Sequence, residues 1–338
     1  MHSEPLTEQT SSSLVDPFGR TINYLRMSVT DRCNLRCTYC MAEDMTFLPR
    51  QKILSLEELR DAAHAFVQLG IRKIRLTGGE PLIRRDIVKL VHSIAAMPGL
   101  DEVTMTTNGM LLPKLSQPLK EAGLARLNIS VDSLKPQRFK DLTRVGDIDL
   151  WHRGIVAAKK AKFSKLKLNA VILAGFNDDE VVDLARFAVD NDMDISFIEE
   201  MPLGVISSHE RSKTQITSEI IRNQLEKEFD LINSLETTGG PSRYAHVAGS
   251  RSKIGFISPM SNNFCEACNR VRMTAEGRFL LCLGNEHSID LRSVMRSYPG
   301  DSALLKSKIV DALKNKPERH HFDPNRTDIV RFMNMTGG

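Results

Sequence analysis

The sequence lacks long hydrophobic runs, and it lacks a strong excess of either charge. No apolar stretch approaches the roughly 20 residues that span a bilayer, so no membrane segment is expected. The formal net charge is only +4 over 338 residues, which gives little support for a nucleic-acid partner. Residues 1–13 contain no arginine and no apolar core, so they fit neither a secretory signal nor a transit peptide. We therefore expect a cytoplasmic protein that begins with a flexible tail over residues 1–15.

Cysteine is absent from most of the chain. The six cysteines fall into two groups, Cys33, Cys37 and Cys40 near the N-terminus and Cys265, Cys268 and Cys282 near the C-terminus. A secreted disulfide framework is not expected in a chain of this length without a signal peptide. The grouping instead favours metal or catalytic chemistry in a reducing compartment.

Strands and helices alternate through the first two thirds of the chain. A strand at 24–29 precedes the first cysteine group, and a helix from Ser55 to Gly70 begins with a Ser55/Glu58 capping box. Further strands are predicted at 73–76, 102–106, 126–131, 165–173 and 194–198. Helices are predicted at 84–97, 136–142, 150–162, 178–191 and 217–229, and one more helix ends at Gly123. Six strand-helix units predict an α/β fold with a parallel sheet, a partial (βα)6 TIM-like barrel over residues 16–235. In such barrels the loops after the strands carry the chemistry.

The pattern changes after residue 235. Short β-like runs occur at 253–257, 270–274 and 279–281, and a helix is predicted at 303–314. We interpret residues 236–338 as a smaller α+β module that carries the second cysteine group and ends in Gly337-Gly338.

The first cysteine group has the spacing Cys33-x3-Cys37-x2-Cys40 and follows a strand. Three thiolates leave a four-iron cluster one ligand short. The amino and carboxylate groups of S-adenosylmethionine can chelate such an open iron. A partial zinc site or three incidental thiols are the alternatives.

The second cysteine group again supplies three thiolates. Arg270 and Arg272 follow it and lie two residues apart, so on a strand both side chains face one way and could reach one anion. A zinc knuckle completed by His287 is the alternative for the cysteines. A solvated strand face is the alternative for the two arginines.

The first motif resembles the signature of the radical S-adenosylmethionine superfamily, including the aromatic Tyr39 before Cys40. The segment 77–81 (TGGEP) resembles the part of this superfamily that contacts the methionyl group of the cofactor. Its glycines allow close approach of the backbone to a ligand, and Glu80 could accept a hydrogen bond from an ammonium group.

The chain further resembles the GTP 3',8-cyclase family, also called molybdenum cofactor biosynthesis protein A. The segments that carry this resemblance are Phe18-Gly19-Arg20, 24–31 (YLRMSVTD), 106–109 (TTNG), 128–133 (NISVDS), 197–201 (FIEEM), 264–270 (FCEACNR) and Gly337-Gly338. The resemblance implies a lyase with two [4Fe-4S] clusters that opens molybdenum cofactor (molybdopterin) biosynthesis. It implies that a 5'-deoxyadenosyl radical abstracts the ribose 3' hydrogen of GTP, giving (8S)-3',8-cyclo-7,8-dihydroguanosine 5'-triphosphate.

The same resemblance assigns roles to individual residues. The implied contacts of S-adenosylmethionine are Tyr39, Gly79, Ser130 and Met201. The implied contacts of GTP are Arg26, Arg75, Thr106, Lys167, Arg270 and Arg272. The implied catalytic residues are Arg26, Gly337 and Gly338. The implied partners are a flavodoxin- or ferredoxin-type electron donor, the downstream cyclic pyranopterin monophosphate synthase and a second copy of the chain.

One residue departs from the family pattern, and one assignment has competing candidates. Ala42 stands where the family usually has proline, and Lys162 and Lys165 compete with Lys167 for the same assignment. Two other functions stay open at this point: a related radical enzyme that acts on a peptide, and a non-catalytic protein with two structural zinc sites.

Overall fold

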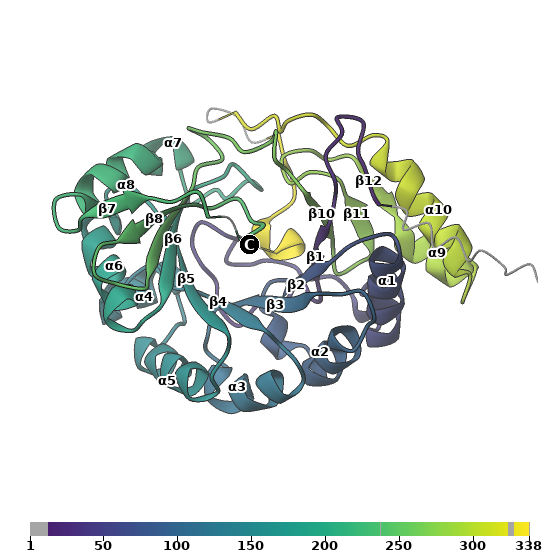
Figure 1. Cartoon of the computed structure of the whole chain (residues 1–338), viewed down its shortest axis with the longest axis horizontal. Helices are drawn as coiled ribbons and strands as arrows, with labels where there is room; N and C mark the ends of the chain where they lie inside the picture. The colour runs from purple at the N-terminus through teal and green to yellow at the C-terminus, as the bar shows by residue number, and fades with distance from the viewer. Residues whose placement is uncertain (1–12, 237, 324–327, 338) are drawn as a thin grey trace, which may run out of the picture.

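The computed structural model describes residues 13–236, 238–323 and 328–337. One twelve-stranded sheet curves around the centre of the molecule, and helices α1 to α6 lie on its outer side (Figure 1). The strands are β1 (Tyr24–Ser28), β2 (Lys73–Thr77), β3 (Glu102–Thr107), β4 (Arg126–Ser130), β5 (Lys165–Ile172), β6 (Asp194–Glu199), β7 (Leu231–Asn233), β8 (Arg243–Val247), β9 (Lys253–Ile257), β10 (Arg270–Met273), β11 (Arg278–Leu280) and β12 (Ser288–Asp290). The α-helices are α1 (Leu56–Gln68), α2 (Ile87–Ala95), α3 (Leu112–Glu121), α4 (Pro136–Thr143), α5 (Ile148–Lys160), α6 (Val181–Asp190), α7 (Arg211–Thr214), α8 (Ser218–Leu225), α9 (Leu291–Ser297), α10 (Ser302–Leu313) and α11 (Met333–Thr336).

Strands β1 to β6 are neighbours in chain order, and each pairs in parallel with the next. The predicted α/β barrel of six units is therefore confirmed. The capping box is confirmed as well: Ser55 Oγ accepts from the Glu58 backbone N–H, and the Glu58 carboxylate accepts from the Ser55 N–H. The backbone N–H groups of Ser55 and Glu58, which have no partner within the helix, each gain a hydrogen-bond acceptor in this way.

Alternation along each strand divides the sheet into two faces. In β5, Leu166 and Leu168 are buried in the hydrophobic core. Lys167 and Asn169 point to the opposite face and line the central cavities. Polar residues on alternate positions of these strands thus become the wall of the barrel interior.

The C-terminal strands extend this sheet at both edges. Strand β10 pairs in parallel with β1, and β9 pairs in parallel with β6. The sequence predicted the runs that become β9, β10 and β11, but it missed β7, β8 and β12. The division at residue 235 therefore follows the chain order, while in space both parts share one sheet.

The two ends of the chain behave differently. Residues 1–12 of the expected tail lie outside the described residues. Leu14 is buried and Val15 forms an isolated bridge with Thr21, so these residues belong to the folded body. The last helix, α11, lies at the centre of the barrel (Figure 1). No helix of the described residues is long and apolar enough to cross a membrane.

Candidate active site

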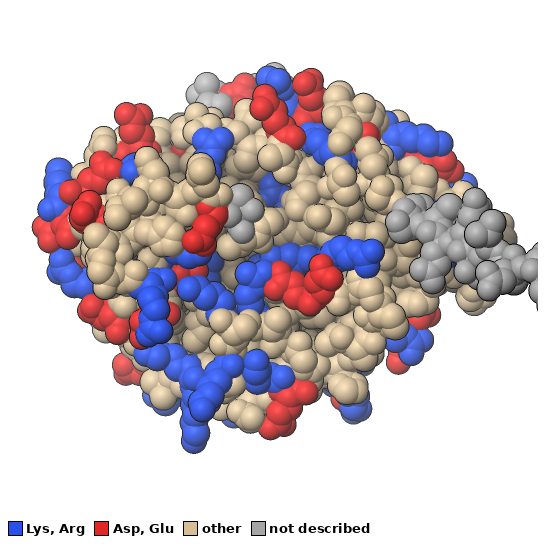
Figure 2. Space-filling model, viewed as in Figure 1, with Lys and Arg blue, Asp and Glu red and all other residues tan. Residues whose placement is uncertain are grey.

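Two cavities meet inside the barrel. The first cavity spans about 1090 Å³, including space open to solvent, and is lined by Cys33, Cys37 and Cys40. The second cavity spans about 1150 Å³, again including space open to solvent, and is lined by Cys265, Cys268 and Cys282. The residues that line both cavities are Asn169, Ile198, Met201 and Met333. In the space-filling view the molecule is hollowed at its middle, and Lys and Arg side chains gather there (Figure 2).

The first cysteine group lies in the loop after β1. Burial raises the pKa of the Cys33 thiol to about 11 and that of the Cys40 thiol to about 12. Burial also raises the pKa of Cys37 well above its ordinary value, and the neighbouring Cys40 and Cys33 add to this effect. The three thiols are therefore close enough to oppose one another's ionisation. Binding of iron would replace their protons, so the donor set fits a cluster with three protein ligands.

Glu80 and Gly79 fix the wall of the first cavity. A Cβ atom on Gly79 would overlap the backbone of Arg32, so only glycine fits there. The buried Glu80 carboxylate accepts from Leu82 N at 2.9 Å, Thr107 Oγ1 at 2.7 Å and Asn108 N at 2.7 Å. Glu80 thus ties the loop after β2 to the loop after β3. The contact with a ligand ammonium that its sequence position suggested stays a prediction.

Tyr39 is held by Asp132, at the end of β4. Its hydroxyl donates to Asp132 Oδ2 at 2.7 Å, and Val171 N donates to Asp132 Oδ1 at 2.9 Å. The Asn177 amide donates to the backbone oxygen of Asp132 at 2.7 Å. Burial raises the pKa of Asp132 to about 6. The ring of Tyr39 is therefore positioned by Asp132, which is itself held by the 171–177 segment.

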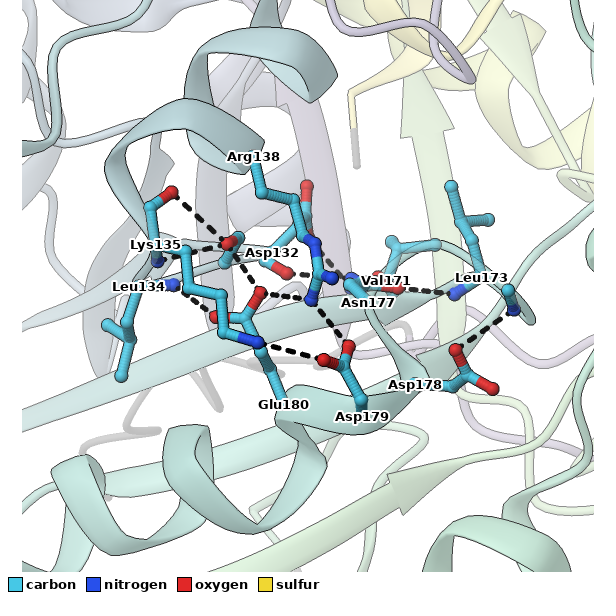
Figure 3. Close-up of polar contacts among 12 residues, drawn as sticks. Asp132, Leu134, Lys135, Arg138, Val171, Leu173, Asn177, Asp178, Asp179 and Glu180 are labelled. Atoms are coloured by element: carbon cyan, nitrogen blue, oxygen red, sulfur yellow. Dashed lines mark hydrogen bonds and ion pairs between the residues drawn. The ribbon is translucent and has the colours of Figure 1, made fainter.

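Glu180 binds the residues that follow Asp132 in the chain (Figure 3). Its carboxylate accepts from Ser133 Oγ at 2.7 Å, Leu134 N at 2.9 Å and Arg138 Nη1 at 2.6 Å. Glu180 is 1% exposed, whereas its neighbour Asp179 binds Lys135 and Arg138 nearer the surface. Sequence reasoning missed this network, because acidic residues at a helix start are commonly solvated.

The second cavity is lined by positive charge. Its cationic residues are Arg26, Lys73, Arg75, Lys167, Arg270 and Arg272, and no Asp or Glu occurs among the described residues that line it. Arg26 of β1 is in register with Arg272 of β10 on one side and with Arg75 of β2 on the other. Parallel strands lie about 4.8 Å apart, so these three arginines form a row.

Burial and repulsion between neighbouring cations both act on Arg26 and Arg272. Burial lowers the pKa of Arg26 to about 10, and it lowers the pKa of Arg272 well below its ordinary value, with further lowering by Arg26 and Arg270. Burial alone would raise the pKa of Tyr24, but Arg75 and the other nearby cations outweigh it and lower that pKa to about 7. A bound polyanion would relieve this concentration of charge.

The other residues predicted from sequence fall into these two cavities. Tyr39, Gly79, Ser130 and Thr106 line the first, so Thr106 lies apart from the other expected GTP contacts, although Arg75 Nη1 donates to it at 3.3 Å. His287 is exposed, and the second cavity is lined by His320 instead. The polar lining residues that sequence reasoning missed are Tyr24, Lys73, Asn128, Asn169, Thr238, Ser242 and His320.

The second cysteine group is in a more cationic setting than the first. Burial by itself raises the pKa of Cys268, but Lys316 and Arg270 outweigh it, and the pKa lies below its ordinary value. Burial raises the pKa of Cys282. In the described part of the chain, no three His, Cys, Asp or Glu side chains are arranged to hold a single metal ion. Three thiols beside buried cations fit an anionic cluster.

The C-terminal segment enters between the two cavities. Asn334 is buried and its amide donates to the Asp31 backbone oxygen at 2.8 Å. Gly337 has a φ of +75°, and a Cβ atom on it would overlap the Thr77 side chain. Both features require glycine. Gly338, the other predicted catalytic glycine, lies outside the described residues.

Comparisons with known proteins agree with this geometry. The Radical SAM superfamily matches residues 27–188, and the Molybdenum Cofactor Synthesis C family matches residues 193–322. GTP 3',8-cyclase of Pseudomonas entomophila (strain L48) and that of Pseudomonas putida (strain W619) are each 60% identical to this chain over 98% of it and 100% of their own length. The crystal structure of Streptococcus suis SuiB bound to S-adenosylmethionine is 15% identical, with a TM-score of 0.58 over 88% of this chain and 66% of that one, which is a likeness of fold. The chain belongs to the GTP 3',8-cyclase family of the radical S-adenosylmethionine superfamily.

Proposed function

We propose that this chain converts GTP to (8S)-3',8-cyclo-7,8-dihydroguanosine 5'-triphosphate, the first step of molybdenum cofactor biosynthesis. One observation supports it most: a cavity lined by six Lys and Arg residues and three cysteines adjoins a second cavity that holds the radical-type cysteine motif. A triphosphate brings about four negative charges, and arginine is suited to bidentate contact with phosphate. The neighbouring cysteine motif would supply the radical chemistry of S-adenosylmethionine, after which the superfamily is named.

Two groups of residues would hold the cofactors. Cys33, Cys37 and Cys40 would bind one [4Fe-4S] cluster, and Cys265, Cys268 and Cys282 would bind another. S-adenosylmethionine at the first cluster supplies the one-electron chemistry that removes a hydrogen atom from the substrate. Tyr39, Gly79, Ser130 and Met201 would surround S-adenosylmethionine, since they line the first cavity.

The remaining work of the chain is to orient GTP. Arg26, Arg270 and Arg272 would bind the triphosphate, with Arg75 and Lys167 beside them. In the arrangement that the family resemblance implies, the guanine would face the second cysteine group and the ribose would lie toward the boundary of the two cavities. A reactive species formed in the first cavity could then reach the 3' carbon without diffusing. Holding reactants in such a geometry provides much of the rate acceleration in reactions of this kind.

Four further parts of the proposal rest only on membership of the family. They are a flavodoxin- or ferredoxin-type reductant, transfer of the product to cyclic pyranopterin monophosphate synthase, a homodimer and a cytoplasmic location.

The proposal is tested with reconstituted, reduced protein supplied with S-adenosylmethionine and GTP under anaerobic conditions. We expect about eight irons per chain, and formation of both 5'-deoxyadenosine and the cyclised nucleotide only when GTP is present. Cleavage of S-adenosylmethionine that is indifferent to GTP would contradict the substrate assignment.

The role of the C-terminal glycines has its own test. A chain that lacks Gly337 and Gly338 should keep both clusters but lose cyclisation, because Gly337 lies between Thr77 of the first cavity and Arg272 of the second. Full conversion of GTP by the truncated chain would sink this part of the proposal.

A further inference from the structure

Lys316 lies behind the second cysteine group, three residues after the end of α10. Its side chain comes from outside both cysteine motifs, and the residue is only 3% exposed. The ammonium donates to the Leu281 backbone oxygen at 2.6 Å, to the Arg270 backbone oxygen at 3.1 Å and to Cys268 Sγ at 3.7 Å. An ammonium has three protons to donate, so the three contacts use its full capacity.

These contacts join the two segments that carry cysteines. Arg270 follows Cys268 by two residues, and Leu281 immediately precedes Cys282. By binding both carbonyls, Lys316 fixes the distance between the two segments. The third cysteine is fixed to the same region by Arg20, whose guanidinium donates to the Cys265 oxygen at 2.8 Å and to the Pro317 oxygen at 2.7 Å.

In the part of the chain that the structure describes, Lys316 has no carboxylate partner. Among the described residues, no Asp or Glu oxygen lies within ion-pair distance of its Nζ. Burial of a cation is costly unless an anion or several hydrogen bonds compensate it. The nearest candidate anion is the sulfur of Cys268, so this ammonium is placed to balance the charge of a thiolate-bound group.

We propose that Lys316 is the positioning and charge-balancing residue of the second cysteine group, and that its ammonium raises the reduction potential of the cluster bound there. This inference rests on the second cluster of the proposed function. A fixed positive charge stabilises the more negative, reduced state of a nearby cluster. Net charge, hydrogen bonds to the sulfurs and solvent exposure are the features that set such potentials.

The test compares three variants of the full chain, each reconstituted with iron and sulfide. Lys316→Met keeps an unbranched side chain one heavy atom shorter and removes the charge, while Lys316→Arg keeps the charge. Lys314→Met is the matched control, because Lys314 is two residues away, exposed and paired with Asp311. Iron content and a redox titration followed by electron paramagnetic resonance are measured, and the first cluster is an internal reference.

In Lys316→Met we expect the ratio of reduced to oxidised second cluster at a fixed potential to fall about tenfold, which equals about 59 mV for a one-electron couple. The first cluster and the Lys314→Met protein should not change. Selective loss of second-site iron from Lys316→Met, with retention in Lys316→Arg, would also support the proposal.

Three results would overturn it, and they separate its failure from that of the proposed function. An unchanged second-cluster potential in a fully loaded Lys316→Met protein would remove the charge-balancing role. Equal loss of second-site iron from both Lys316 variants would show a purely steric requirement. Only about four irons in the unaltered chain would overturn the second cluster itself, and this inference with it.

Discussion

The guanidinium of Arg272 donates a hydrogen bond of 2.7 Å to the backbone oxygen of Gly337, across 65 residues of sequence. Arg272 also belongs to the row of arginines that we propose binds the triphosphate, in register with Arg26. The same side chain therefore contacts the C-terminal segment and faces the proposed substrate. If Arg272 binds the triphosphate as proposed, this one residue would couple substrate binding to the placement of the C-terminal segment.

Replacing Gly337 with alanine should displace the C-terminal segment. Gly337 has φ +75° and ψ 132°, a backbone region that costs alanine about 1–3 kcal/mol, and an added Cβ would overlap Thr77. We expect formation of the cyclised nucleotide to fall at least about tenfold, which corresponds to about 1.4 kcal/mol. Gly300→Ala is the control, because Gly300 has a similar φ of +80° with no atom near the added Cβ. Equal activity of the two variants would contradict the role of the segment.

Lys167 should contribute to GTP binding, whereas Lys162 and Lys165 should not. Its ammonium donates to Tyr244 Oη at 2.8 Å and lines the second cavity, whereas Lys162 is exposed and Lys165 pairs with Asp194. Lys167→Met should weaken GTP binding about tenfold or more, about 1.4 kcal/mol, as measured by calorimetry on the reconstituted chain. Lys162→Met is the control, and a comparable loss in that variant would move the assignment away from Lys167.

Glu180 should contribute more to stability than its neighbour Asp179. The Glu180→Gln variant leaves a buried network incompletely satisfied, so the free energy of unfolding should fall by about 1–3 kcal/mol. Asp179→Asn removes pairs to Lys135 and Arg138 near the surface, and its cost should stay within about 1 kcal/mol. Urea denaturation of the two proteins measures the difference, and a larger loss for Asp179→Asn would refute the ranking.

Glu80 should make the stability of the metal-free chain depend on pH. Burial raises its pKa to about 7, above the ordinary value of about 4.3. The folded chain therefore holds this proton more tightly than the unfolded chain does, and the resulting stabilisation is complete below about pH 4.3 and lost as pH rises through about 7.

The measurement is the free energy of unfolding of the unaltered chain relative to Glu80→Gln. This difference should decrease by on the order of 2–3 kcal/mol between pH 5 and pH 8. The comparison removes the contribution of Asp132, which is common to both proteins. A difference that is constant with pH would show that Glu80 is ionised throughout this range.

Local patterns in the sequence determined much of this protein. The capping box at Ser55, the alternation of strands and helices, and the spacing of Cys33, Cys37 and Cys40 predicted a barrel of six units with a cysteine loop after its first strand. These predictions depend on interactions between residues a few positions apart, which a sequence displays directly. The segment around Gly337 was recognised through the family resemblance.

The tertiary structure alone decided how distant polar residues meet. Nothing near Arg270 in sequence indicates that β10 pairs in parallel with β1, yet this pairing puts Arg272 beside Arg26. Pairing between strands depends on packing of the whole sheet, so neighbours in space can be hundreds of residues apart in sequence. For the same reason Lys316, in a stretch that reads as a polar tail, is revealed as a buried cation of the second cysteine group only in the folded chain.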